Sequence, residues 1–252
     1  MRRFAQQQNS SPVVAAIDPR IRLLAALLLL VLVISSTGSA FPWLIVGLCL
    51  PAALFAGLSL RVFCLRLLHP LCISLMILLL KALLGAGTPF VLFTVADYHV
   101  LIHQTGLQEG VLITSRIMGA ASIAILLGRM LTFTESMAAL AWLRVPRGLV
   151  DVSLFAWRSL FMLYDDAGVV YNAQKNRLGY CGVRRSLRSF GAMAGMLTVR
   201  ALDDSLSMTT AMTQRGYDGT LPRLRGPRLN AAQLTGLAVF ALATGMVWKL
   251  QN

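Results

Sequence analysis

The chain has 252 residues, of which 57% are hydrophobic and only 13% are charged, and its mean hydropathy is +0.70. A soluble domain of this size has too little interior to bury so much apolar surface, which argues against a soluble globular protein. Lys and Arg outnumber Asp and Glu by 23 to 10, an excess that in a membrane protein marks cytoplasmic loops. The sequence therefore predicts an all-α integral membrane protein whose basic surface meets membrane lipid or an acidic partner rather than nucleic acid.

Five runs are apolar over enough residues to cross a bilayer as helices, which takes about 20 residues. They are residues 21–38, 42–58, 70–86, 110–128 and 231–249. A further stretch, 88–106, is moderately apolar but is broken by Asp97, His99 and His103. We expect an outside loop or a re-entrant segment there, and a sixth span is the alternative. The His-x-x-x-His pair would share one face of a helix and could bind a metal, but we interpret both as ordinary loop histidines and predict no metal site.

Basic residues gather at one end of the predicted spans. Arg2, Arg3 and Arg20 precede the first span, and Arg61 and Arg66 follow the second, whereas the linkers after the first and third spans carry no Lys or Arg. The N-terminus is therefore predicted to be cytoplasmic, and five spans would place the C-terminus outside.

Two spans carry a basic residue of their own, Lys81 in the third and Arg116 in the fourth. Charge is costly inside a membrane, so such residues either line a transport path or, more often, pair with carbonyl groups in the protein interior. None of the five predicted runs contains Asp or Glu, which counts against a self-contained, proton-coupled permease.

The segment from 144 to 228 is too basic for lipid, with 13 Lys and Arg by count. Apolar residues recur in it at helical spacing, which predicts two amphipathic helices. The two stripes are Val150, Leu154, Trp157, Phe161 and Tyr164, and then Phe190, Met193, Leu197 and Ala201. The predicted division is a cytoplasmic segment 1–20, four spans within 21–129, a cytoplasmic coupling-helix domain 130–228 and a last span within 229–252.

Four short motifs carry a resemblance to a known family over nearly the whole chain. They are Asp18-Pro19-Arg20, Leu143-Arg144-Val145-Pro146-Arg147, Ala173-Gln174-Lys175-Asn176-Arg177 and Ala211-Met212-Thr213-Gln214-Arg215-Gly216-Tyr217. With these the chain resembles the transmembrane T component of energy-coupling factor transporters, and most of all its cobalt-transport, CbiQ-type branch.

The resemblance implies that two arginine-centred motifs end the coupling helices and that each arginine docks on one ATPase subunit. Here those motifs are Asn176, Arg177 and Leu178, and Gln214, Arg215 and Gly216. Asn176 and Gln214 stand where alanine is usual, and Leu178 stands where a small residue is usual. The second motif is thus the closer match.

The resemblance further implies a scaffold subunit of an ABC-type importer in a bacterial inner membrane. Its partners would be two cytoplasmic ATPase subunits and a substrate-binding membrane S component. Cobalt is the expected substrate, with nickel or a vitamin as alternatives. The residues themselves include no phosphate-binding glycine loop and no grouped catalytic triad, so we expect no ATP hydrolysis by this chain, no enzymatic activity and no cofactor. A self-contained permease and a membrane-embedded enzyme are the competing classes.

Overall fold

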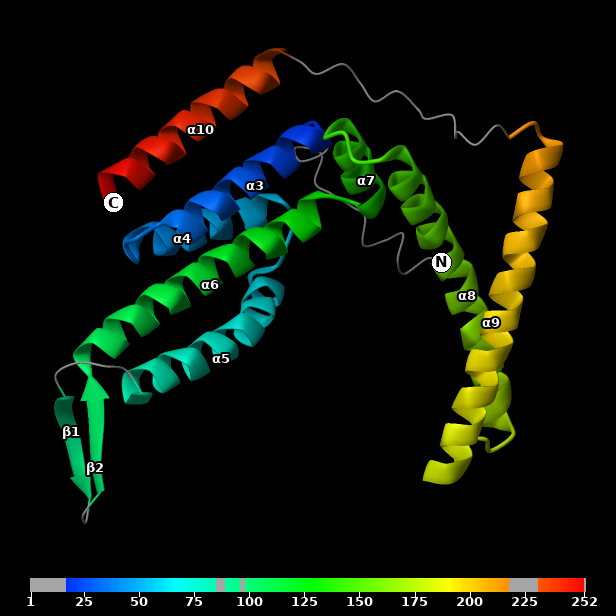
Figure 1. Cartoon of the computed structure of the whole chain (residues 1–252), viewed down its shortest axis with the longest axis horizontal. Coiled ribbons are helices and arrows are strands. Elements are labelled where there is room, and N and C mark those ends of the chain that lie inside the picture. The colour runs from blue at the N-terminus through cyan, green and yellow to red at the C-terminus, as the bar shows by residue number, and fades with distance from the viewer. Residues whose placement is uncertain (1–16, 85–88, 96–97, 218–230, 252) are drawn as a thin grey trace. The chain divides into compact units, whose positions relative to one another are not determined.

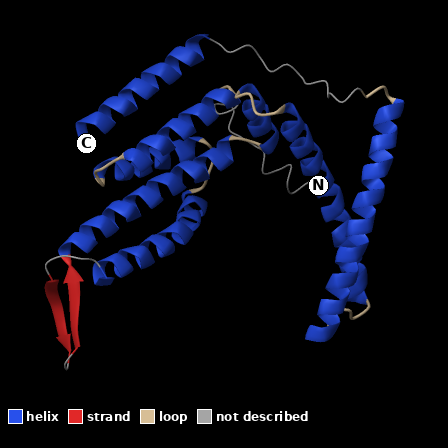
Figure 2. Ribbon diagram, viewed as in Figure 1, coloured by secondary structure: helices blue, strands red, loops and turns tan. Residues whose placement is uncertain are grey.

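A computed structural model describes residues 17–84, 89–95, 98–217 and 231–251 (Figure 1). Over these residues the chain forms eight helices and one two-stranded hairpin, which Figure 2 draws in red. The elements are α3 (Pro19–Ser35), α4 (Ala40–Phe55), α5 (Leu60–Leu84), β1 (Pro89–Val95), β2 (Tyr98–His103), α6 (Gln104–Met130), α7 (Phe133–Trp142), α8 (Arg147–Asn176), α9 (Val183–Gln214) and α10 (Ala231–Gln251).

The described chain divides into two compact units. One contains residues 17–139 and 231–251, and the other contains residues 140–217. The first, which we call the apolar unit, holds helices α3 to α6, most of α7, α10 and the hairpin. The second, which we call the coupling unit, holds α8 and α9. Helix α7 crosses the boundary at residue 140, so it links the two units covalently.

Helix α6 is the centre of the apolar unit and packs against α3, α4 and α5. Small residues allow this close approach, as is common between membrane helices. A Cβ atom added to Gly119 would lie 3.1 Å from Cγ1 of Val33 and 3.3 Å from Cβ of Pro42. The apolar core beside this contact consists of Leu29, Val33, Phe41, Ile45, Cys49 and Ile123, and α10 covers it with Phe240, Val247 and Trp248.

Each of the five predicted apolar runs coincides with a helix, namely α3, α4, α5, α6 and α10. Three helical segments are both long and apolar enough to cross a membrane: Leu60–Leu83, Gln104–Met130 and Gln233–Gln251. The other two helices, α3 and α4, are shorter, with 17 and 16 residues. Large apolar side chains cover the outside of these helices, as a lipid environment requires; on α5 they include Leu65, Leu68, Ile73, Met76 and Leu79.

Two helices, α5 and α6, begin six or more residues earlier than the sequence predicts. Helix α5 starts ten residues before the predicted run and keeps Pro70 in its interior. Helix α6 starts at Gln104, so it includes Glu109, and the expectation that no spanning helix contains an acidic residue is wrong. Glu109 Oε2 lies 3.0 Å from Nζ of Lys81, and both side chains are substantially exposed. Lys81 is therefore in an ion pair between α5 and α6 and does not line an interior path in this structure.

The described part of the segment 88–106 forms an antiparallel hairpin before α6 begins. Phe90 pairs with Ile102 and Val95 pairs with Tyr98, with an irregularity between Val91 and Phe93. It is therefore not a helical sixth span, and the expected outside loop or re-entrant segment has the form of a β-hairpin. His99 and His103 both belong to β2. Along a strand, residues four apart are separated by about 13 Å, so the pair cannot chelate one ion as it would on a helix.

Candidate functional site

The predicted coupling helices form a helical hairpin within the coupling unit. Helix α8 ends at Asn176, and after a short turn α9 runs back along it, as Figure 1 shows. The two helices are joined by an ion pair of 2.8 Å between Asp166 Oδ2 and Arg200 Nε. On α9, Met193, Leu197 and Ala201 are half-buried, which agrees with the predicted stripe.

Other parts of α9 differ from the prediction, because several large apolar residues are exposed, one of them in the predicted stripe. Phe190 and Leu202 were expected to lie in or beside the buried stripe, yet 62% and 61% of their surfaces are accessible. The described part of α9 contains no buried residue at all. Large apolar residues of α9 are exposed on more than one side of the helix, and they include Val183, Leu187, Phe190, Val199, Leu202 and Leu206. Exposed apolar surface of this kind is typical of a helix that contacts a partner or a membrane.

The two arginine-centred motifs fold into nearly identical helix ends. Arg177 is the C-cap residue of α8, with φ −91° and ψ 18°, and Arg215 is the C-cap residue of α9, with φ −89° and ψ 9°. The next residue is left-handed in both, with φ 57° at Leu178 and 76° at Gly216. The sequence places the arginines at corresponding positions, and the structure gives them corresponding backbones.

Backbone hydrogen bonds explain why the two ends match. In α8, the N–H of Leu178 donates to Lys175 at 3.1 Å, and the N–H of Gly179 donates to Gln174 at 2.8 Å. In α9, the N–H groups of Gly216 and Tyr217 donate to the carbonyls of Thr213 and Met212, both at 3.0 Å. This is the Schellman motif, in which the chain turns back on itself and satisfies two terminal carbonyls. Each helix end therefore has two of its terminal carbonyls satisfied, and the arginine side chain beside them is exposed.

Both arginines are exposed, and they lie far apart. Arg177 sits at the α8–α9 turn and Arg215 sits at the opposite end of α9. The 32 residues of α9 separate the two ends by about 48 Å, at about 1.5 Å per residue. A rigid helix of that length can hold two docking points at a fixed separation.

The turn that carries Arg177 is fixed by side chains. The amide of Gln174 donates to the carbonyl of Ser189 at 3.1 Å and accepts the hydroxyl hydrogen of Tyr180 at 2.7 Å. The hydroxyl of Ser189 donates to the carbonyl of Gly179 at 2.9 Å, and a Cβ at position 179 would lie only 2.8 Å from that hydroxyl oxygen. The turn is therefore closely packed, and the direction of Arg177 is tied to the start of α9.

In the apolar unit, Arg116 and Arg22 satisfy the carbonyl ends of helices. Nε of Arg116 donates at 3.0 Å to the carbonyl of Ser36, the C-cap residue of α3, and its Nη2 donates to the same oxygen. Arg22 donates to the carbonyl of Met130, the last residue of α6. For Arg116 the structure thus has the carbonyl pairing that was one of its two predicted roles. Sequence reasoning assigned no role to Arg22.

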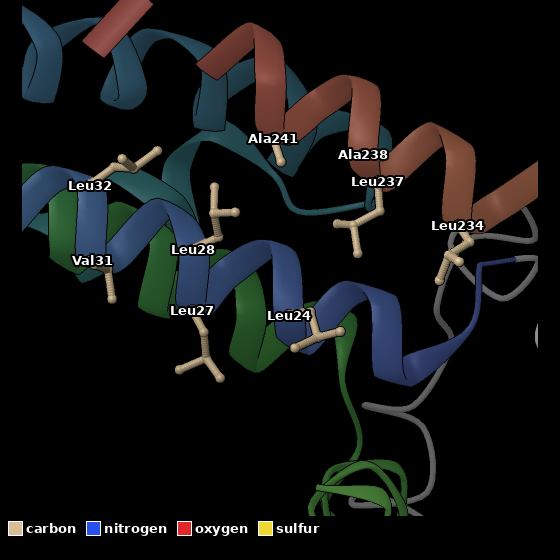
Figure 3. A pocket seen from close by; sticks show the side chains of 9 residues that line it. All are labelled: Leu24, Leu27, Leu28, Val31, Leu32, Leu234, Leu237, Ala238 and Ala241. Carbon is tan, nitrogen blue, oxygen red and sulfur yellow. The ribbon is translucent and has the colours of Figure 1, made fainter. Parts of the chain in front are cut away.

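A groove of about 570 Å³ separates α3 from α10 (Figure 3). All of its lining residues are aliphatic: Leu24, Leu27, Leu28, Val31, Leu32, Leu234, Leu237, Ala238 and Ala241. The groove offers no ligand for a metal ion. In the part of the chain that the structure describes, no three His, Cys, Asp or Glu side chains come together in a way that could hold one.

Comparison with known proteins places this architecture in a family. A family model described as "Cobalt transport protein" matches residues 10–225. The chain belongs to the CbiQ cobalt transport protein family. With its apolar helices, this CbiQ-family chain is a multi-pass membrane protein. The resemblance drawn from the four motifs is thereby confirmed at the level of the family.

Three curated relatives are similar to this CbiQ-family chain. An uncharacterized protein of Methanocaldococcus jannaschii is 25% identical over 83% of the chain and 78% of its own length. The putative fused cobalt transport protein CbiMQ of Methanocorpusculum labreanum is 28% identical over 87% of the chain and 37% of its own length. The cobalt transport protein CbiQ of Salmonella typhimurium is 32% identical over 50% of the chain and 56% of its own length. The chain thus spans most of the first relative and smaller shares of the other two.

Proposed function

We propose that this protein is the T component of an energy-coupling factor importer, with cobalt as the transported substrate. It would transmit ATP hydrolysis by two cytoplasmic ATPase subunits to a substrate-binding membrane S component. The observation that carries the proposal is the pair of matching helix ends, those of α8 and α9, each with an exposed arginine and separated by the length of α9, about 48 Å. In this proposal the chain is a scaffold and not an enzyme.

Arginine at a closed helix end suits a docking point on a moving partner. Its guanidinium is planar, remains charged at every working pH and donates in a fork to carboxylates or to helix-end carbonyls. The sites comprise Asn176, Arg177 and Leu178 at the end of α8, and Gln214, Arg215 and Gly216 at the end of α9. The exposed apolar residues of α9 lie between these ends and would provide area for contact with the S component or the ATPases.

The membrane arrangement belongs to the same proposal. Helices α3, α4, α5, α6 and α10 would be five spans of a bacterial inner membrane, with the N-terminus and residues 130–228 in the cytoplasm. Cobalt as the substrate, and partner proteins in the membrane, are suggested by the names of the relatives, one of which is a fused CbiMQ protein. The S component would hold the substrate, since the apolar groove has no metal ligands.

The proposal is tested by reversing the charge of each proposed anchor. Arg177→Glu and Arg215→Glu change exposed residues at helix ends, so their cost to folding should be small, about 0.3–1 kcal/mol from the helix dipole. Loss of one partner from a desolvated interfacial charge pair costs about 2–5 kcal/mol, or roughly 30- to several-thousand-fold in affinity. We expect loss of ATPase co-purification and of cobalt uptake at equal membrane expression. Arg215→Glu should have the larger effect because its motif is the closer match.

Matched controls are provided by two other exposed arginines of α9, Arg184 and Arg188. Their reversal changes the net charge by the same amount but leaves both helix ends intact, so ATPase binding should be nearly normal. Equal loss of binding in all four variants would mean that a diffuse basic surface holds the ATPases, and the two-anchor mechanism would then be wrong.

A further inference from the structure

The link between α6 and α7 lies in the apolar unit, shortly before the chain enters the coupling unit within α7. Only Leu131 and Thr132 separate the two helices. Thr132 and Glu135 form a capping box: the N–H of Thr132 donates to Glu135 Oε2 at 2.9 Å, and the N–H of Glu135 donates to the Thr132 hydroxyl oxygen at 3.3 Å. The capping box fixes the start of α7 but does not by itself attach α7 to another helix.

Arg22 supplies that attachment from α3. Its side chain is 5% exposed, and Nη2 lies 3.5 Å from Oε1 of Glu135, the carboxylate oxygen that the capping box leaves unused. Its Nη1 donates to the carbonyl of Met130 at the end of α6. One buried guanidinium therefore joins three helix ends: the N-terminal part of α3, the C-terminus of α6 and the first turn of α7. We call Arg22, Met130 and Glu135 the α3–α7 clasp.

The chemistry of the clasp makes it specific for arginine. A buried cation must be compensated by good partners, and here a helix-end carbonyl and a carboxylate lie on two sides of one planar group. Lysine has a single nitrogen and cannot reach both acceptors in the same geometry. The electrostatics also agree, because a cation at the carbonyl end of α6 interacts favourably with the helix dipole.

We propose that Arg22 and Glu135 are positioning residues for energy coupling, through which movement of α8 and α9 is passed by way of α7 to α3. The inference rests on the proposed function. A two-residue link has soft backbone dihedral angles, and movement entering α7 would be absorbed there if α7 were held by the link alone. The clasp holds the first turn of α7 to a membrane helix, so rotation of α7 must move α3 as well.

Two single variants test the clasp, and each removes one partner of the interaction between Arg22 and Glu135. Arg22→Met removes the guanidinium with little change in size and leaves the capping box intact. Glu135→Gln removes the carboxylate charge, and glutamine still serves in a capping box. Arg61→Met is the matched control, because Arg61 is an exposed arginine of α5 outside the clasp. The double variant Arg22→Met with Glu135→Gln tests whether the two residues act through one interaction.

The first measurement uses the complex reconstituted with its ATPase and S subunits. We expect both single variants to assemble and hydrolyse ATP, while substrate imported per ATP falls roughly tenfold, the size expected when one hydrogen bond to a charged group is lost. The double variant should be no worse than the poorer single variant, and Arg61→Met should match the unaltered chain. A merely structural role would lower the amount of complex but not the transport ratio.

The second measurement uses the isolated chain, so that the clasp is tested apart from the proposed function. Spin labels at Leu27 in α3 and Ala138 in α7, both exposed, report the distance between these helices in a background lacking native cysteines. Arg22→Met should broaden that distance distribution, and Arg61→Met should not. An unchanged distribution, or a broadened one with a normal transport ratio, would overturn the proposal. Failure of the unaltered chain to bind ATPases would instead refute the T-component assignment.

Discussion

Four residues in left-handed backbone conformation follow helix ends: Gly57, Arg144, Leu178 and Gly216, with φ between 57° and 78°. Each follows the C-cap residue of a helix and takes part in the same pair of backbone hydrogen bonds. The Schellman motif requires this conformation, which glycine adopts without steric cost and other residues do not. The small residue that the family resemblance implies at position 178 therefore has a backbone reason, and Leu178 occupies the position under strain.

This strain predicts that Leu178→Gly stabilises the end of α8. Glycine removes the steric cost of the left-handed conformation, which is about 1–2 kcal/mol for an L-residue. The greater conformational freedom of glycine in the unfolded chain offsets about 0.4–1 kcal/mol of this gain in stability. Leu178 is 62% exposed, so little packing is lost. We expect a net gain in stability of about 0.5–1 kcal/mol, measured as slower hydrogen exchange of the backbone amides at positions 178 and 179.

The matching substitution in the other direction is Gly216→Leu. It introduces the same strain at the end of α9 and should speed exchange there by a corresponding amount. If both substitutions changed exchange in the same direction, the left-handed strain would not be what limits the stability of these ends.

The buried Arg22 and the half-buried Arg116 illustrate what sequence can and cannot predict at the residue scale. A basic residue in an apolar run indicates a carbonyl or acidic partner, and that expectation holds for Arg116. The partner itself, Ser36, is 80 residues away, and no local pattern identifies it. Arg22 is more than a hundred residues from Met130. The Thr132–Glu135 capping box, by contrast, has the local Thr-x-x-Glu signature and was available to sequence reasoning.

At the scale of elements, the α8–α9 turn depends on Gln174. Its amide bonds both Ser189 and Tyr180, and Gln174 belongs to the motif that ends in Arg177. Gln174→Leu keeps the size of the side chain but removes both hydrogen bonds, each worth about 0.5–1.5 kcal/mol. We expect faster proteolysis and faster hydrogen exchange at residues 177–182, together with weaker ATPase binding at that end.

The control for this prediction is Lys175→Leu, which alters an exposed neighbour in the same turn of α8. It should leave the exchange of the turn unchanged. Normal protection of residues 177–182 in Gln174→Leu would mean that the backbone motif and the packing at Gly179 hold the turn without the amide.

Long elements with strong periodicity were predictable, whereas elements that depend on distant contacts were not. The positions of α8 and α9 follow from apolar spacing, and the five apolar runs each give a helix. The hairpin was missed because its strand 89–95 is almost uniformly apolar, a pattern that does not distinguish a strand from a loop or a short helix. The early start of α5 was missed because Pro70 and the basic residues before it interrupt the apolar run in the sequence, although a membrane helix can continue through proline.

At the scale of the molecule, the sequence carries two different kinds of helix. The apolar unit encloses a core around α6 and presents aliphatic side chains outward, while α9 in the coupling unit has no buried residue. A helix that buries so little within its own chain depends on other surfaces for much of its stabilisation. In the proposed scaffold role, the apolar unit would contact lipid and α9 would contact partner subunits.

The proposed topology makes a prediction about a native thiol. If α3, α4, α5, α6 and α10 are five spans and the N-terminus is cytoplasmic, the α8–α9 turn lies inside and the C-terminal end of α10 lies outside. Cys181 is exposed in that turn. In a chain lacking its other cysteines, a membrane-impermeant maleimide should label Cys181 only after the cells are permeabilised, whereas Gln251→Cys, in a chain without Cys181, should be labelled in intact cells.

The β1–β2 hairpin gives an independent test of the proposed topology, because it follows α5 and should lie on the outer side of the membrane. Thr94→Cys in β1, again in a chain without other cysteines, should therefore be labelled in intact cells, as Gln251→Cys is. Labelling of Cys181 from outside would reverse the orientation of the whole chain. Protection of both Cys181 and Gln251→Cys in intact cells would place them on one side of the membrane. Of the five proposed spans only α10 lies between these two positions in the chain, so α10 would then not cross the membrane, and the five-span topology would be wrong.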